Sequence, residues 1–231
     1  MDKNVAQAYI RRKKRKRRAA IISSVCSFVI GVFILVAFLI MKVDRFTITT
    51  LNEPELSLSI DENREVMTTE LQAPPLLSAT DTQYSDIPNN IEEGVGSKNC
   101  RYYFAYSFYL LGKGSAENIN YSMSMSLLDI SNNIEEAIKV MIIKDGERSI
   151  YSKTSKPIYH GTDHLAGPDS VIGETRPYWD DDHIALIWDK IAPGAYVKYT
   201  IVIWIDGWES DDSMRAGTFS ANLKFSTKLD K

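Results

Sequence analysis

The sequence predicts a mainly β protein, with an antiparallel β-sandwich or jelly-roll ectodomain preceded by one transmembrane α-helix. Three observations lead to this prediction. Residues 19–41 carry no charge, a basic block lies directly before them, and the rest of the chain is a series of short alternating segments separated by turn residues. The composition, with 44% hydrophobic and 25% charged residues, is that of an ordinary folded protein.

The apolar run AAIISSVCSFVIGVFILVAFLIM at 19–41 is predicted to span a bilayer. A helix needs only about 20 apolar residues to cross the hydrocarbon core. The basic block at 11–18 is expected to stay in the cytoplasm. A cleaved signal peptide is the alternative, but the run is longer than a signal core, and MKVDRFT after it lacks small residues spaced for cleavage.

The predicted organisation is therefore a basic cytoplasmic tail at 1–18, a transmembrane helix at 19–41 and an extracellular β-sandwich domain at 44–231. The chain is expected in the cell membrane as a single-pass signal-anchor protein with its amino terminus inside. The lipid bilayer is the expected partner of the helix. Anionic lipid heads are the expected partner of Arg11 to Arg18, at about 1 kcal/mol per basic residue near the surface.

The formal net charge of -3 hides a strong asymmetry along the chain. Nine of the 27 basic residues and one of the 30 acidic residues precede residue 42, so the rest of the chain holds 18 basic and 29 acidic side chains, a balance of -11. Such an acidic domain repels phosphates, and nucleic acid is not an expected partner.

Alternation with a period of two predicts the first strands of the ectodomain. FTITT at 46–50 and ELSLSI at 55–60 have this pattern, and a short strand is possible at 65–71 within the loop-rich region that follows. Residues 101–112 and 119–130 are longer, and the turn-like GKGSAEN between them predicts an antiparallel pair. In the second segment Tyr121, Met123, Met125 and Leu127 share one face.

The second half of the chain repeats these signals. Residues 131–138 predict a brief helical turn capped by Ser131 or Asn132, and Asp145-Gly146 predicts a type I′ hairpin turn. Further strands are expected at 183–189, 195–206 and 217–227. The stretch 197–205 is apolar on both faces and should lie in the middle of a sheet, with Trp188 and Trp204 in the core.

The two cysteines are not expected to form a disulfide with each other, because Cys26 lies in the apolar run and Cys100 far beyond it. Burial is the favoured state of Cys100, and a free thiol or a bridge between chains is left open.

Two loops carry candidate metal ligands. His160, Asp163 and His164 lie in IYHGTDHLAGPD, where imidazole and carboxylate groups could hold Zn²⁺. Asp180 and Asp182 belong to the densest acidic cluster, DDDH, whose oxygens could bind Ca²⁺. An ordinary polar loop and a solvated acidic turn are the favoured interpretations, because neither HExxH nor the EF-hand spacing is present.

The segments YSDIPNNIEEGVGSKNCRYYFAYSFYLLGKGSAENINYSMSM and IAPGAYVKYTIVIWIDGW resemble a group of uncharacterised single-pass surface proteins of Gram-positive bacteria. That resemblance covers nearly the whole chain and implies a basic tail, one helix and a surface domain. A weaker similarity links the chain to the TasA and camelysin type of exported β-sandwich. No catalytic residue is carried over from either group.

These observations favour a membrane-anchored, non-catalytic cell-surface domain that acts through contacts with an unknown surface protein or wall polymer. The chain has no GxSxG, GxGxxG, phosphate loop or Cys/His nucleophile pattern. The alternatives are a metal-dependent surface hydrolase, and a subunit of an extracellular, biofilm-matrix-like fibre in which an edge strand such as ELSLSI pairs with a neighbouring chain.

Overall fold

A computed structural model describes most of residues 45–231 and little of what precedes them. The described residues are 31–32, 46–50, 54–76, 79–114, 118–160 and 170–227. The chain divides into two units, Met1–Asp44 and Arg45–Lys231. The predicted tail at 1–18 and, apart from residues 31–32, the predicted helix at 19–41 lie outside the described residues. Within the described ranges, no helix has both the length and the apolar character needed to cross a bilayer.

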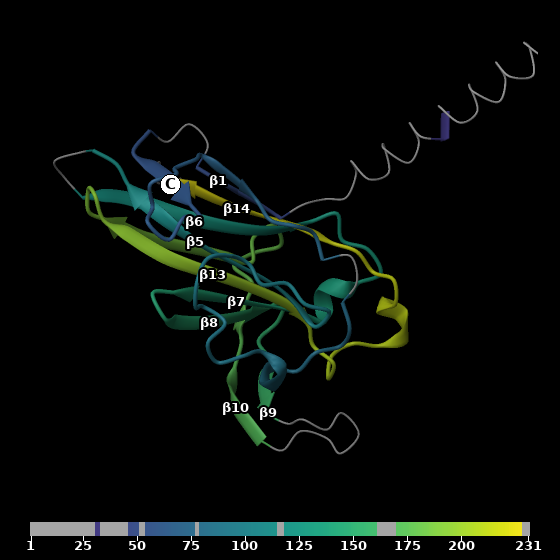
Figure 1. Cartoon of the computed structure of the whole chain (residues 1–231). Coiled ribbons are helices and arrows are strands. Elements are labelled where there is room, and N and C mark those ends of the chain that lie inside the picture. The colour runs from purple at the N-terminus through teal and green to yellow at the C-terminus, as the bar shows by residue number, and fades with distance from the viewer. Residues whose placement is uncertain are drawn as a thin grey trace, which may run out of the picture. The chain divides into compact units, whose positions relative to one another are not determined.

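The second unit is mainly β, as predicted, and most of its strands belong to two large sheets (Figure 1). The five-stranded sheet has the order β12 (Ala185–Ile191), β6 (Ile119–Leu128), β14 (Ser220–Ser226), β1 (Thr47–Thr49) and β3 (Glu70–Gln72). The seven-stranded sheet has the order β11 (Arg176–Pro177), β8 (Glu147–Ser152), β7 (Ile138–Lys144), β13 (Tyr196–Ile205), β5 (Tyr103–Gly112) and β2 (Leu56–Ser59), with β4 (Gly96–Ser97) also paired to β5.

The remaining elements are small. Strands β9 (Pro157–His160) and β10 (Ser170–Glu174) form a two-stranded sheet of their own, which projects from the two larger sheets in Figure 1. Three short 3-10 turns, η1 (Tyr84–Asp86), η2 (Ile134–Glu136) and η3 (Asp212–Met214), are described in the connections. The predicted helical turn at 131–138 corresponds to η2, although its N-cap is Asn133, in a left-handed conformation and without a side-chain cap.

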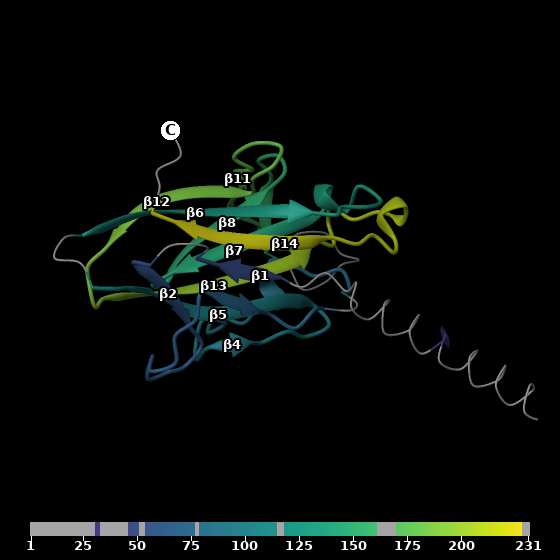
Figure 2. The ribbon, with the colours of Figure 1, turned by 90° about the horizontal axis from the view of Figure 1, so that it is seen from above.

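The main core lies between the two large sheets, an arrangement consistent with the predicted sandwich (Figure 2). One wall comes from alternate residues of β6 and β14, which include Tyr121, Met123 and Phe225, all fully buried. The other wall comes from β5, β7 and β13, where Phe108 stacks on Tyr199 with ring centroids 5.8 Å apart. The period-two pattern of β6 therefore marks its buried face as predicted.

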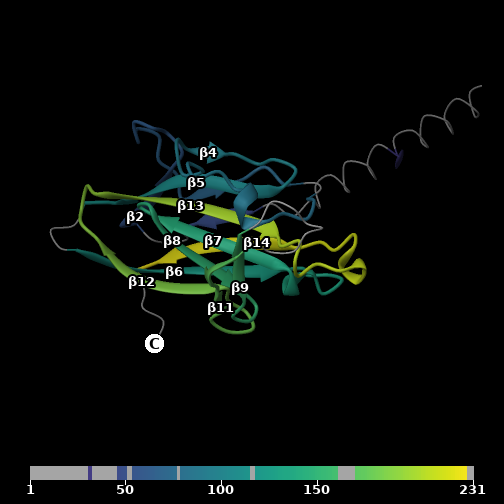
Figure 3. The same ribbon diagram turned by 90° about the horizontal axis from the view of Figure 1, so that it is seen from below.

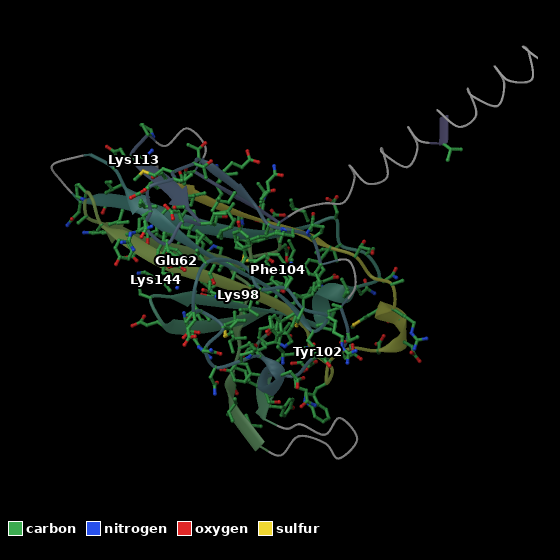
Figure 4. All side chains as sticks on the ribbon, viewed as in Figure 1. Glu62, Lys98, Tyr102, Phe104, Lys113 and Lys144 are labelled. Carbon is green, nitrogen blue, oxygen red and sulfur yellow. The ribbon has the colours of Figure 1, made fainter. Side chains whose placement is uncertain are left out.

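A second, smaller core covers the outer face of the seven-stranded sheet. Trp204 is 1% exposed there, and Ile87 and Ile91 from the segment that carries η1 pack onto the same cluster. Figure 4 shows the labelled Lys98 in this region; its Nζ donates to Ile91 O over 2.6 Å and to Ser107 Oγ over 3.0 Å. Strand β13, paired with β7 and β5, is therefore buried on both faces, as its apolar sequence predicted.

The strand pairing differs from the sequence prediction in two respects. Strands β5 and β6 do not pair with each other, because β5 joins the seven-stranded sheet and β6 the five-stranded one. The turn after Gly112 therefore carries the chain from one sheet to the other. In addition, β1 pairs with β14 and β8 with β11 in parallel, so the sheets are mixed and not purely antiparallel.

The predicted type I′ hairpin joins β7 and β8. Asp145 has a φ of 47° and Gly146 a φ of 88°, and this turn type requires both angles to be positive. Lys144 pairs with Glu147 across the turn, so the loop has only two residues. The prediction from the Asp-Gly dipeptide is confirmed.

Candidate functional site

Two tryptophans meet on the surface beside the five-stranded sheet. The ring centroids of Trp179 and Trp188 are 5.3 Å apart with the ring planes at 73°, an edge-to-face pair. The two side chains are 56% and 45% exposed. We name this pair the Trp corner. The prediction that Trp188 belongs to the core is wrong, whereas the same prediction for Trp204 is confirmed.

The strand pattern explains why Trp188 faces outward. In β12, Ala185 and Ile191 are buried against the core, whereas Trp188 and Lys190 alternate with them and are exposed. The position of Lys190, two residues after Trp188 and therefore on the same face, is the sequence signal that could have placed this tryptophan in solvent.

The inward face of β12 is fixed to the other sheet by a polar cluster. Asp189 forms an ion pair with Lys144 at the end of β7 and accepts a hydrogen bond from Tyr121 Oη over 3.3 Å. Tyr121 Oη is in turn 2.8 Å from Tyr199 Oη. Burial raises the pKa of both Tyr121 and Tyr199, so these hydroxyls stay protonated at neutral pH. Strand β12 is thereby held at a defined position below the Trp corner.

Trp179 is positioned by the acidic turn that the sequence analysis identified as a candidate calcium site. The amide of Trp179 donates to Ile184 O over 3.3 Å, and the amide of Asp180 donates to His183 O over 3.2 Å. Asp180 Oδ1 accepts from the amides of Asp182 and His183 over 2.9 and 2.7 Å. The same oxygen is 2.8 Å from His183 Nδ1.

These bonds change the chemistry of the Asp180 carboxyl. Desolvation by the turn raises its pKa, but the hydrogen bond from the His183 ring and those from the two amides outweigh it, so the pKa of Asp180 lies below its ordinary value. The carboxylate closes the turn that follows Trp179. Asp182 beside it is exposed.

The other predicted metal ligands are only partly described. His160 is the last residue of β9 and pairs with Ser170 of β10, whereas Asp163 and His164 lie outside the described residues. Among the residues that the structure does describe, no group of three or more His, Cys, Asp or Glu side chains is placed to hold a metal ion. Zinc at 160–164 and calcium at Asp180 and Asp182 remain predictions. Cys100, predicted to be buried, is a free thiol of intermediate exposure.

The outer face of the five-stranded sheet extends from the Trp corner and consists mostly of hydroxyl and amide side chains. We name this surface the hydroxyl face. Its members are Lys190 of β12, Ser122, Ser124 and Ser126 of β6, Asn222, Lys224 and Ser226 of β14, Thr47 and Thr49 of β1, and Glu70 and Gln72 of β3. Apart from the buried Ser122, they are half-buried or exposed.

The strand register arranges the hydroxyl face in rows that cross the sheet. Ser122 lies between Trp188 and Ser226, so the first row begins at the Trp corner. Lys224 lies between Ser124 and Thr49 in the next row. Figure 3 shows β12 along the margin of this sheet beside β6. The rows therefore form one continuous surface with the indole pair at one end.

Comparisons with family models, with curated proteins and with solved structures found no match to this chain. The candidate site consequently rests on its own geometry. It was missed in the sequence because serines alternating with Tyr121, Met123 and Met125 look like the solvent side of any strand. Only the pairing of β6 with β12 and β14 brings them together with Trp188.

Proposed function

We propose that the chain is a single-pass membrane protein whose β-sandwich or jelly-roll ectodomain binds a partner at the bacterial cell surface and catalyses no reaction. The uncharged run at 19–41 and the basic block at 11–18 support the membrane helix and the orientation. The resemblance to surface proteins of Gram-positive bacteria supports the location. Two sheets around a common core support the sandwich.

The observation that carries the binding proposal is the Trp corner. Exposed apolar side chains that lie in contact mark interaction sites more reliably than scattered ones. Trp179 and Trp188 come from a loop and an edge strand, and the backbone at each is held by the Asp180 turn and the Asp189 cluster. Two indoles that already pack against each other lose less conformational entropy on binding than separate side chains would.

The ion pairs of the described domain support a structural and not a catalytic use of its charges. Lys156 Nζ lies 2.5 Å from Glu209 Oε2, and Arg148 donates to Glu92 Oε2 over 2.8 Å. Each of these pairs ties a loop to another segment. The carboxylates of Glu209 and Glu92 are thus held by cations that join segments of the fold.

The surroundings of β2 argue against the fibre-subunit alternative. This strand, which contains most of ELSLSI, lies at the end of its sheet, as an edge strand should. Its four residues are all buried, however, and Leu58 exchanges two backbone hydrogen bonds with Thr68 over 2.8 and 2.9 Å. Part of the edge that a neighbouring chain would use is therefore already paired.

Sedimentation of the purified full chain with isolated Gram-positive cell walls tests the binding proposal. The wild-type protein should pellet with the walls, and Trp188→Ala should reduce the bound fraction. Tyr196→Ala is the matched control, because Tyr196 is 50% exposed but belongs to the seven-stranded sheet. Equal retention of all three proteins would contradict the role of the Trp corner.

The orientation is tested on intact cells. External protease should digest the ectodomain and leave a small membrane-bound fragment that contains residues 1–41. A mature protein that begins near Asp44 would contradict the membrane helix, because it would show that the apolar run is removed as a signal peptide.

A further inference from the structure

We infer that the Trp corner and the hydroxyl face together bind an uncharged polysaccharide chain, with one sugar ring in the corner and the following rings across the strands. This inference rests on the proposed binding function and names its ligand class.

The first argument is the shape and chemistry of the corner. The planes of Trp179 and Trp188 meet at 73°, so the pair presents two apolar walls and not a flat platform. An indole ring packs its face against C–H groups and retains an N–H donor. A sugar ring has apolar C–H faces and a rim of hydroxyls, and it can therefore contact one wall through a face and leave its hydroxyls free for hydrogen bonds.

The second argument is the composition of the hydroxyl face. Serine, threonine and asparagine side chains both donate and accept hydrogen bonds, which matches the hydroxyl groups of a saccharide. Serine is depleted from protein–protein interfaces, where aromatic, Met and Arg side chains predominate at the centre. The serine row of β6 thus favours a sugar over a protein as the occupant.

The third argument is charge. Residues 42–231 carry a balance of -11, but the charged groups described on the outer face of the five-stranded sheet are Lys190, Lys224 and Glu70, and the last two lie in one row. A phosphate-bearing polymer would need a cationic surface to hold it. A nearly neutral face in an acidic domain fits an uncharged chain.

The fourth argument is the spacing of the rows. Neighbouring strands in a sheet lie about 4.8 Å apart, close to the length of one sugar unit in an extended β-linked chain. A chain that starts at Trp188 passes over the buried Ser122 of β6 to Ser226 of β14, and then meets the neighbouring row of Lys224 and Thr49. Three to four sugar units, as an order-of-magnitude estimate from this spacing, would cover the surface.

The test is a titration of the purified full chain, in a zwitterionic detergent without a sugar head group, with three tetrasaccharides. Cellotetraose and tetra-N-acetylchitotetraose carry β1,4 linkages, and maltotetraose carries α1,4 linkages. Tryptophan fluorescence and calorimetry report binding. We expect saturable binding of at least one β-linked tetrasaccharide and weaker binding of the disaccharide with the same linkage. The affinity should depend little on salt concentration.

Variants connect that binding to the site. Trp188→Ala and Trp179→Ala should each weaken the affinity about tenfold, because both remove an apolar wall. Ser124→Ala on the hydroxyl face should weaken it severalfold and leave folding unchanged, since Ser124 is half-buried on the outer face. Tyr196→Ala should bind as the wild type does.

Three outcomes would overturn the inference: no saturable binding of any saccharide at millimolar concentrations, binding unchanged in both tryptophan variants, or tighter binding of a phosphate-containing wall polymer that weakens steeply with salt. The sedimentation experiment separates the two proposals. If the protein pellets with the walls, Trp188→Ala reduces the bound fraction and no tetrasaccharide binds, the surface-binding function is upheld and the saccharide ligand is refuted.

Discussion

Lys139 and Asp206 form an ion pair inside the protein, with Nζ and Oδ2 2.6 Å apart and side chains only 2% and 4% exposed. Lys139 lies on β7, and Asp206 follows the last residue of β13. Asp206 also accepts a hydrogen bond from the amide of Trp208 over 2.9 Å. Because the two charges lie beside Trp204 in the second core, neither can be solvated if its partner is removed.

Loss of one partner should therefore be costly. We expect Lys139→Met to reduce the free energy of unfolding by about 3 to 5 kcal/mol, and Lys139→Met/Asp206→Leu to recover much of that loss. Urea denaturation of the purified chain measures both. The exposed pair Arg215–Asp212 is the control, and Arg215→Ala should cost below about 0.5 kcal/mol. Similar losses of unfolding free energy in Lys139→Met and Arg215→Ala would contradict the burial of Lys139.

The turn between β5 and β6 should not tolerate a side chain at Gly112. A Cβ there would lie 2.7 Å from Ala192 O and 3.3 Å from Ile119 Cδ1 and Ile191 Cγ2. We expect Gly112→Ala to cost about 1 to 3 kcal/mol, because backbone must move to make room. At Gly173 the nearest atom to a Cβ is 3.8 Å away, so Gly173→Ala is the control and should shift the thermal midpoint little.

Acrylamide quenching of fluorescence tests the positions of the tryptophans. Trp179 and Trp188 are exposed, Trp208 is half-buried and Trp204 is 1% exposed, so quenching should resolve an accessible and a protected fraction. Trp188→Phe and Trp179→Phe should each reduce the accessible fraction, whereas Trp204→Phe should reduce only the protected fraction. An accessible fraction unchanged in Trp188→Phe would restore the prediction that this side chain is buried.

Acid stability should depend on Asp61, which organises the loop after β2. Its carboxylate accepts hydrogen bonds from the amides of Glu65 and Asn63, and these bonds lower its pKa. A lowered folded pKa stabilises the protein above the unfolded pKa of about 3.9, and that contribution is lost as pH falls through the folded value. The difference in urea midpoint between wild type and Asp61→Asn should be constant from about pH 6 to 8 and shrink below about pH 4.

Metal binding is tested by calorimetry with Ca²⁺ and Zn²⁺. The Asp180 carboxylate already accepts hydrogen bonds from two backbone amides. We therefore expect Asp180→Asn to loosen the turn and increase the quenching of Trp179. Any response to Ca²⁺ should stay unchanged in this variant. Saturable Zn²⁺ binding that is lost in both His160→Ala and His164→Ala would favour the metal-dependent hydrolase over the binding function.

The sequence by itself determined which strands are buried on both faces and where one turn closes. Strand β13 is apolar on both faces, and such a run is stable only between two other strands. Asp145-Gly146 specifies its hairpin because few residues adopt two successive positive φ angles. The alternation of Tyr121, Met123 and Met125 likewise marked the inner face of β6. These are local properties, and local chemistry is sufficient to predict them.

Tertiary structure alone decided which strands pair and what faces the solvent. The sequence predicted β5 beside β6, but β5 pairs with β13 in one sheet and β6 with β14 in the other, and Gly112 lies where backbone of the loop before β13 leaves no room for a side chain. Trp188 was expected in the core because indoles are usually buried, yet the side chains that alternate with it already fill the space below β12. An alternating pattern identifies the two faces of a strand, whereas only packing between sheets determines which neighbours complete a site such as the Trp corner.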